Sequence, residues 1–96
     1  MSKFLLKLYI TGRTPRAERA VTNLRRICAE RLNGQYELVV INILENPQLA
    51  EDEKILATPT LVKELPLPVR RIIGDLSDSD KVLPCLGLEP KKKSKR

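Results

Sequence analysis

Few side chains in this sequence can perform covalent or metal chemistry. Two are cysteines, Cys28 and Cys85, and the 96 residues include no histidine. A histidine-based triad, a histidine metal site and histidine acid–base catalysis are therefore excluded. The cysteines lie too far apart in the sequence for a CxxC pair, and alone they are too few for a zinc site. We interpret both as small buried hydrophobic residues in a reducing compartment.

The acidic runs and the glycines do not match a known metal or phosphate motif. Glu51-Asp52-Glu53 lacks the Asp-x-Asp-x-Asp-Gly spacing of a calcium loop, so we interpret it as the charged surface of a helix. Asp78 and Asp80 suit a helix N-terminus. The four glycines are scattered, without GxGxxG or GxxxxGK spacing. The sequence therefore predicts no metal site and no cofactor.

The net charge of +6 is concentrated at the C-terminal end. Residues 91–96 hold five basic side chains, and without them 13 basic residues face 12 acidic ones. We therefore expect one domain over residues 1–88 and a basic, disordered tail over 89–96. The tail is interpreted as a solubilising end or as an electrostatic contact with nucleic acid or an acidic protein.

The first half of the chain has a strand–helix–strand pattern. Residues 4–10 alternate in the manner of a strand, and Thr14-Pro15 is typical of a helix start. Apolar residues then recur at spacings of three and four until Asn33-Gly34 ends the helix. Residues 36–44 are almost continuously apolar, which predicts a parallel strand covered on both faces.

The second half is divided by prolines. Asn46-Pro47 predicts a marginal helix over about residues 47–56, and residues 60–65 and 68–74 predict an antiparallel hairpin. Ser77, with Asp80 three residues on, predicts the N-cap of a last helix that Pro84 should stop or kink.

This order, β-α-β-α-β-β-α, predicts an α/β fold of the thioredoxin-like type. Pro59, just before the third strand, is the candidate for the cis-proline of that fold. Redox members carry CxxC in the first βα turn, where this chain has Thr11-Gly12-Arg13-Thr14-Pro15. A thioredoxin-like redox protein is therefore the disfavoured alternative, and a nucleic-acid-binding protein acting through the tail is another.

Three stretches carry a family resemblance: LKLYITGRTP, ENPQLAEDEKILATPTL and LPLPVRRIIGDLSD. They closely resemble KaiB, the small clock protein of cyanobacteria, and the resemblance runs from about residue 3 to residue 83. It implies a non-enzymatic adaptor that binds the N-terminal ATPase ring of KaiC, captures KaiA and displaces the sensor kinase SasA. It also implies a metamorphic protein with two folds, a homotetramer and a thioredoxin-like monomer that binds KaiC.

The resemblance also implies which residues meet KaiC. By position, the partner-facing basic residues match Arg19, Lys54, Arg70 and Arg71. The family's fold switch would involve the half of the chain from about residue 47 onward.

Two departures from the family pattern shape these expectations. Clock members usually continue after Val82-Leu83 with Ile-Gly-Leu-Asp, where this chain has Pro84, Cys85, Leu86 and Gly87. We expect this change to favour the monomeric thioredoxin-like state over the homotetramer. Glu37 and Val39 replace residues at the face that captures KaiA, which argues against KaiA binding and favours a paralogue serving a KaiC relative.

The N-terminal residues predict no signal peptide, and no run approaches the roughly 20 apolar residues that span a bilayer. The sequence therefore predicts a cytoplasmic protein without membrane contact.

Overall fold

Strand β1 (Phe4–Ile10) is the strand on which the rest of the sheet assembles. It pairs in parallel with β2 (Tyr36–Asn42) and antiparallel with β3 (Thr60–Leu65), which pairs antiparallel with β4 (Arg70–Ile73). The computed structural model, which describes residues 3–88, thus contains a four-stranded sheet in the order β2-β1-β3-β4. The element order β-α-β-α-β-β-α confirms the predicted thioredoxin-like arrangement.

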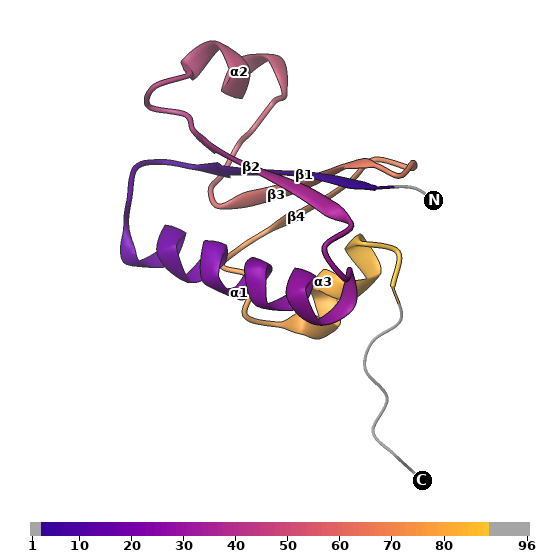
Figure 1. Cartoon of the computed structure of the whole chain (residues 1–96). Helices are drawn as coiled ribbons and strands as arrows, with labels where there is room; N and C mark the ends of the chain where they lie inside the picture. Colours follow the sequence, from indigo (N-terminus) through magenta and orange to yellow (C-terminus); the bar gives the residue numbers. More distant parts are fainter. Residues whose placement is uncertain (1–2, 89–96) are drawn as a thin grey trace, which may run out of the picture.

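The helices are divided between the two faces of the sheet. Helices α1 (Pro15–Arg31) and α3 (Ser79–Cys85) cover one face, whereas α2 (Pro47–Asp52) lies on the other side (Figure 1). The main core fills the space between the sheet and the first two of these helices. Its least exposed side chains, all fully buried, are Leu6, Leu8, Ala20, Leu24, Cys28, Leu61 and Val82. It is aliphatic, as the shortage of aromatic residues predicts.

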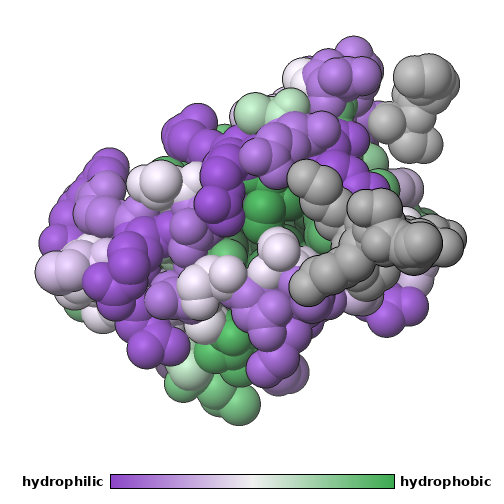
Figure 2. Space-filling view, turned by 90° about the horizontal axis from the view of Figure 1, so that it is seen from below, coloured by the Kyte–Doolittle hydropathy of each residue, from purple (hydrophilic) through white to green (hydrophobic). Residues whose placement is uncertain are grey.

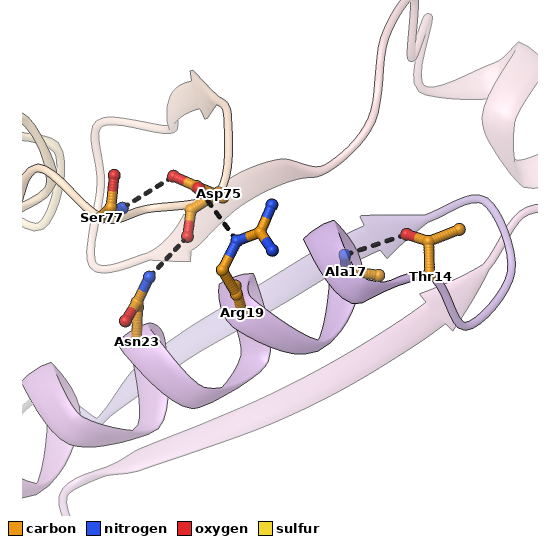
Figure 3. Close-up of polar contacts among 6 residues, drawn as sticks. All are labelled: Thr14, Ala17, Arg19, Asn23, Asp75 and Ser77. Atoms are coloured by element: carbon orange, nitrogen blue, oxygen red, sulfur yellow. Dashed lines mark hydrogen bonds and ion pairs between the residues drawn. The ribbon is translucent and has the colours of Figure 1, made fainter.

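Helix α1 begins where its capping residues predict. The Thr14 hydroxyl accepts a hydrogen bond from the backbone N–H of Ala17 at 3.1 Å, and Pro15 occupies the first helical position (Figure 3). The helix ends at Leu32, after which Asn33 and Gly34 have φ values of +52° and +76°. This left-handed exit turns the chain back into β2.

A smaller buried layer lies on the α2 side of the sheet. Tyr9 and Val62 are 1% and 0% exposed but do not belong to the main core cluster, because alternation along their strands directs them to the opposite face. Burial, followed by the nearby Glu53 and Glu64 carboxylates, raises the pKa of Tyr9. Glu53, directly after α2, therefore lies near Tyr9 on this side of the sheet.

Two features of the central region differ from the sequence-based expectation. β2 is an edge strand and none of its residues is fully buried, so the prediction of a strand covered on both faces is wrong. Its apolar residues are instead partly buried, and Tyr36, Leu38 and Val40 pack against the main core. Helix α2 ends at Asp52 and not near residue 56, because Lys54 takes a left-handed φ of +54° that no α-helix continues.

The start of α3 also differs from the expectation. Its N-cap is Asp78, whose side chain accepts a hydrogen bond from the Asp80 N–H at 3.1 Å, so the prediction of Ser77 as cap is wrong by one residue. The helix runs through Pro84 and ends one residue later. The Leu88 N–H then bonds to the carbonyl of Leu83, and the Gly87 N–H bonds to that of Pro84. This pair of bonds is a Schellman motif, with Gly87 at φ +78° as its left-handed residue.

Replacing Gly87 by alanine will therefore destabilise the end of α3. An L-residue in this conformation costs roughly 1–2 kcal/mol, so we expect urea denaturation to show a loss of about 1 kcal/mol in the free energy of unfolding. Asparagine tolerates the left-handed region better, and Gly87→Asn is expected to lose less. Equal stability of the wild-type chain and Gly87→Ala would contradict the role given to this glycine.

The helical face of the molecule is mainly hydrophilic. Figure 2 shows that hydrophilic residues dominate this side, with a hydrophobic area near its centre and another at its lower edge. Within residues 3–88, no helix is long and apolar enough to cross a bilayer. The basic tail predicted over residues 89–96 lies outside the described residues.

Candidate functional site

The first βα turn and the loop before β3 meet where redox members of this fold hold their thiols. The hydroxyl oxygens of Thr11 and Thr58 are 2.7 Å apart, within hydrogen-bond distance. The Thr58–Pro59 peptide bond is cis, as are Leu65–Pro66 and Leu67–Pro68. No cysteine stands in either loop, so the nucleophile of thiol–disulfide exchange is missing from this position.

Both cysteines lie elsewhere, in the hydrophobic interior. Cys28 is on the buried face of α1, about 20 Å along the helix from its first turn. Burial raises its pKa to about 11. Burial also raises the pKa of Cys85, an effect that Lys63 and Arg70 partly oppose. At neutral pH both side chains are thiols, which are poor nucleophiles.

We expect both thiols to be protected in the folded chain. A disulfide reagent at mildly alkaline pH will react slowly with the native protein and with two thiols per chain in denaturing urea. The pKa of each thiol is raised in the folded state. The contribution of the two thiols to the free energy of unfolding is therefore fully present below the pKa of the unfolded thiol. It decreases as pH rises toward the folded values, about 11 for Cys28. Rapid labelling of the native chain would contradict this burial.

Two of the four predicted partner-binding residues come together. Lys54, which follows α2, and Arg71, from β4, are 17 positions apart in sequence, yet the Arg71 Nη1 atom donates to the Lys54 carbonyl at 3.3 Å. The Arg71 Nη2 atom donates to the Glu53 carbonyl and lies 3.8 Å from the Glu53 Oε1 atom. This contact joins the end of α2 to the edge of the sheet.

Exposed apolar side chains lie beside this pair. Leu56 is 94% exposed and Ile73 is 61% exposed. One shallow hollow is lined by residues that include Lys54, Leu56, Arg71 and Ile73. A second, on the α2 side, is lined by Lys54, Leu56 and several α2 residues. Lys54 and Leu56 therefore line both hollows. We refer to Lys54, Leu56, Arg71 and Ile73 as the α2–β4 surface.

Arg19 lies apart from this surface. Its Nε atom is 3.5 Å from the Asp75 Oδ2 atom, and Asn23 donates to the Asp75 carbonyl at 2.9 Å (Figure 3). Hydrogen bonds from Ser77, with a smaller contribution from Arg19, lower the pKa of Asp75. These contacts fasten the loop before α3 to α1, so Arg19 has a structural partner on the helical side of the sheet.

Arg70 is also on the helical side, since neighbouring residues of a strand point to opposite faces. Its effect on the pKa of Cys85 in α3 agrees with this position. The structure therefore brings Lys54 and Arg71 together and leaves Arg19 and Arg70 elsewhere.

Sequence reasoning missed the apolar part of the α2–β4 surface. Ile55 and Leu56 were expected among the few apolar residues of a marginal helix over about residues 47–56, and Ile73 was expected in a strand of the hairpin, without a role in binding. The signal in the sequence was Pro59, only three positions after Leu56. Because the residue before a proline is disfavoured in the helical conformation, helices usually end before it. Within residues 3–88, no group of three or more potential ligands could hold a metal ion.

Comparison with solved structures defines the class of protein. The N-terminal domain of Synechococcus elongatus SasA matches with a TM-score of 0.75 and 30% identity, over 91% of this chain and 86% of that one. The Drosophila melanogaster thioredoxin Deadhead matches with a TM-score of 0.71 and 13% identity, over 90% of this chain and 80% of that one, which shows the fold alone. The chain is thus a thioredoxin-like domain without a cysteine pair in its first βα turn.

Comparison at the sequence level is more specific. The KaiB domain model matches residues 7–88. The circadian clock oscillator protein KaiB of Synechococcus elongatus is 59% identical over 86 residues, which cover 90% of this chain and 82% of that protein. The circadian clock protein KaiB3 of a Synechocystis species is 53% identical over 89 residues, covering 93% and 85%. The chain belongs to the KaiB family, which supports a clock-related role.

Proposed function

We propose that the chain is a non-enzymatic adaptor that docks on the N-terminal ATPase ring of KaiC or of a KaiC relative. The observation that carries the proposal is the α2–β4 surface, where a leucine that is 94% exposed stands beside a lysine and an arginine. Exposed apolar side chains framed by charges are typical of protein-binding surfaces. Membership in the KaiB family supports KaiC as the kind of partner.

The likeness to the SasA domain supports competition for one site. Two proteins of the same fold, 30% identical in sequence, can present similar surfaces to one ring. We therefore propose that this chain displaces a SasA-type kinase from the ring. Glu37 is exposed on the edge strand β2, and with Val39 it supports the expectation that KaiA is not a partner.

Size-exclusion chromatography with a KaiC-type ring tests the proposal. The chain should elute with the ring, and an excess of the SasA domain should release it. Failure to elute with the ring in every nucleotide and phosphorylation state would contradict the docking proposal.

Charge reversal at Lys54 is expected to weaken that binding. Lys54→Glu should raise the dissociation constant about tenfold, more at low salt than at high salt, because it places a like charge at a complementary contact. Lys81→Glu is the matched control, since Lys81 is an exposed lysine on α3 outside the α2–β4 surface. Equal binding by both variants in calorimetry would remove Lys54 from the site.

We also propose that Pro84, Cys85 and Gly87 favour the monomeric thioredoxin-like state over a tetrameric alternative fold. Cys85 is 7% exposed against the core, and Gly87 supplies the left-handed residue of the Schellman motif at the end of α3. Both features stabilise the helix that this state requires. Light scattering should give the mass of one chain, and a tetramer mass at equilibrium would contradict the bias.

A further inference from the structure

The segment from Glu53 to Leu56 carries the most exposed part of the α2–β4 surface but has little regular structure of its own. Helix α2 before it is only six residues long, has no buried residue, and receives no side-chain cap from Asn46. Such a short helix is not stable alone and needs tertiary contacts. Lys54 adds a further cost, since its φ of +54° is disfavoured for a residue with a Cβ. Some contact outside α2 must hold this segment in place.

Arg71 makes that contact. Backbone N–H groups of the segment bond back to α2: Glu53 to the Leu49 carbonyl at 2.9 Å and Ile55 to the Ala50 carbonyl at 2.9 Å. The carbonyls of Glu53 and Lys54, which lie beyond the helix end, both accept hydrogen bonds from the Arg71 guanidinium. A planar guanidinium can hold two carbonyls at once, whereas a lysine ammonium acts as a point charge without that fixed geometry.

The position of Arg71 in the sheet makes it a rigid support. Its strand partner in β3 is Val62, which is fully buried, so the backbone of Arg71 is anchored beside the small core on this face. The guanidinium reaches from this fixed point to the carbonyl groups that flank the left-handed turn. Leu56 lies two residues after that turn.

We propose that Arg71 is a positioning residue that fixes the left-handed turn at Lys54, and thereby presents Lys54 and Leu56 to the partner. Its hydrogen bonds are already made to backbone carbonyls in the free chain, so its contribution to binding is the conformation of the segment. The importance of this conformation for docking rests on the proposed function, whereas the fixing of the turn does not.

Amide hydrogen exchange of the isotope-labelled free chain, followed by NMR, tests the fixing of the turn without any partner. Arg71→Ala should speed exchange at the Lys54 and Ile55 amides by about tenfold or more. In the wild-type chain, local opening of the segment must break the hydrogen bonds to the guanidinium, and in the variant this cost is absent. Arg71→Lys should give an intermediate rate. Arg70→Ala is the matched control, a neighbouring arginine on the opposite face, and should leave these amides unchanged.

A second change separates fixing of the turn from general destabilisation. Lys54→Gly removes the penalty of the positive φ, so in the Arg71→Ala background it should slow exchange again. Rates in Arg71→Ala that stay within about twofold of the wild-type chain would overturn the proposal. The proposal would also be overturned if Lys54→Gly did not slow exchange in the Arg71→Ala background and exchange were faster throughout the sheet. That result would indicate that Arg71→Ala destabilises the whole domain.

Binding then tests the consequence for docking. If Arg71 acts through the segment, the losses in affinity for the ring caused by Arg71→Ala and Leu56→Ala will be less than additive in the double variant. Additive losses would overturn the positioning role and indicate that Arg71 contacts the partner directly. If the wild-type chain fails to bind the ring, the docking proposal fails, and the exchange result still decides the role of Arg71 in the turn.

Discussion

Shortening Leu56 to alanine will weaken binding to the ATPase ring about 30-fold without changing the stability of the free chain. A leucine that is 94% exposed stabilises the fold little but can bury its whole side chain in a partner. Complete burial of a leucine side chain is worth about 2 kcal/mol, which is about 30-fold in the dissociation constant. Calorimetric titration and urea denaturation of the same samples would check both parts.

Leu67→Ala provides the matched control for this prediction. Leu67 is a leucine that is 72% exposed in the turn between β3 and β4, outside the α2–β4 surface. Its truncation should leave binding and stability unchanged. Equal losses in the two variants would show that nonspecific apolar contact drives the association, whereas no loss in Leu56→Ala would exclude Leu56 as an anchor.

Truncation of Leu24 will destabilise the chain by about 3 kcal/mol. Leu24 is fully buried on the inner face of α1 and belongs to the main core cluster. Leu→Ala changes at such sites cost about 2–5 kcal/mol, because transfer energy is lost and a cavity remains. Small domains have only about 5–15 kcal/mol in total, so the urea midpoint should decrease strongly.

Arg25→Ala, at the exposed neighbouring position of the same helix, is the control for Leu24. It should change the free energy of unfolding by no more than about 0.5 kcal/mol. A loss below about 1 kcal/mol in Leu24→Ala would mean that α1 does not pack on the sheet as described.

Local patterns were sufficient to predict most elements of the fold. Alternation over residues 4–10, the Thr14-Pro15 start of α1 and the proline-bounded strands all follow from short-range sequence, and these elements are present. What local pattern does not determine is the order of strands in the sheet. An apolar run such as residues 36–42 can be central or at an edge, and here β2 is an edge strand because the hairpin of β3 and β4 adds to the other side of β1.

Lys63 shows that local sequence patterns also fail to predict the burial of some side chains. Alternation places it on the same face as Leu61, yet a lysine is expected in solvent. The structure buries it to 3% exposure, and its Nζ atom lies 4.0 Å from where a Cβ of Gly87 would be. The side chain of Lys63 thus extends to the end of α3, 24 positions away in sequence, and no local pattern reveals this neighbour.

The candidate docking surface could also be predicted only in part, because it too depends on contacts between residues that are far apart in the sequence. The resemblance to KaiB singled out Lys54 and Arg71, and the fold joins them through the guanidinium contacts of Arg71. It also singled out Arg19 and Arg70, which the fold places on the helical side. Leu56 was missed because its exposure depends on the left-handed turn at Lys54, a conformation that Arg71 supports from a distant part of the chain.

NMR titration of the isotope-labelled chain with the unlabelled N-terminal domain of a KaiC-type ATPase tests the central claim most directly. Docking through the α2–β4 surface predicts that amide signals of residues 53–56 and 71–73 will shift or broaden first. Signals of the exposed face of α1 should change little. Unchanged spectra at saturating partner, or changes centred on α1, would contradict the proposed docking surface.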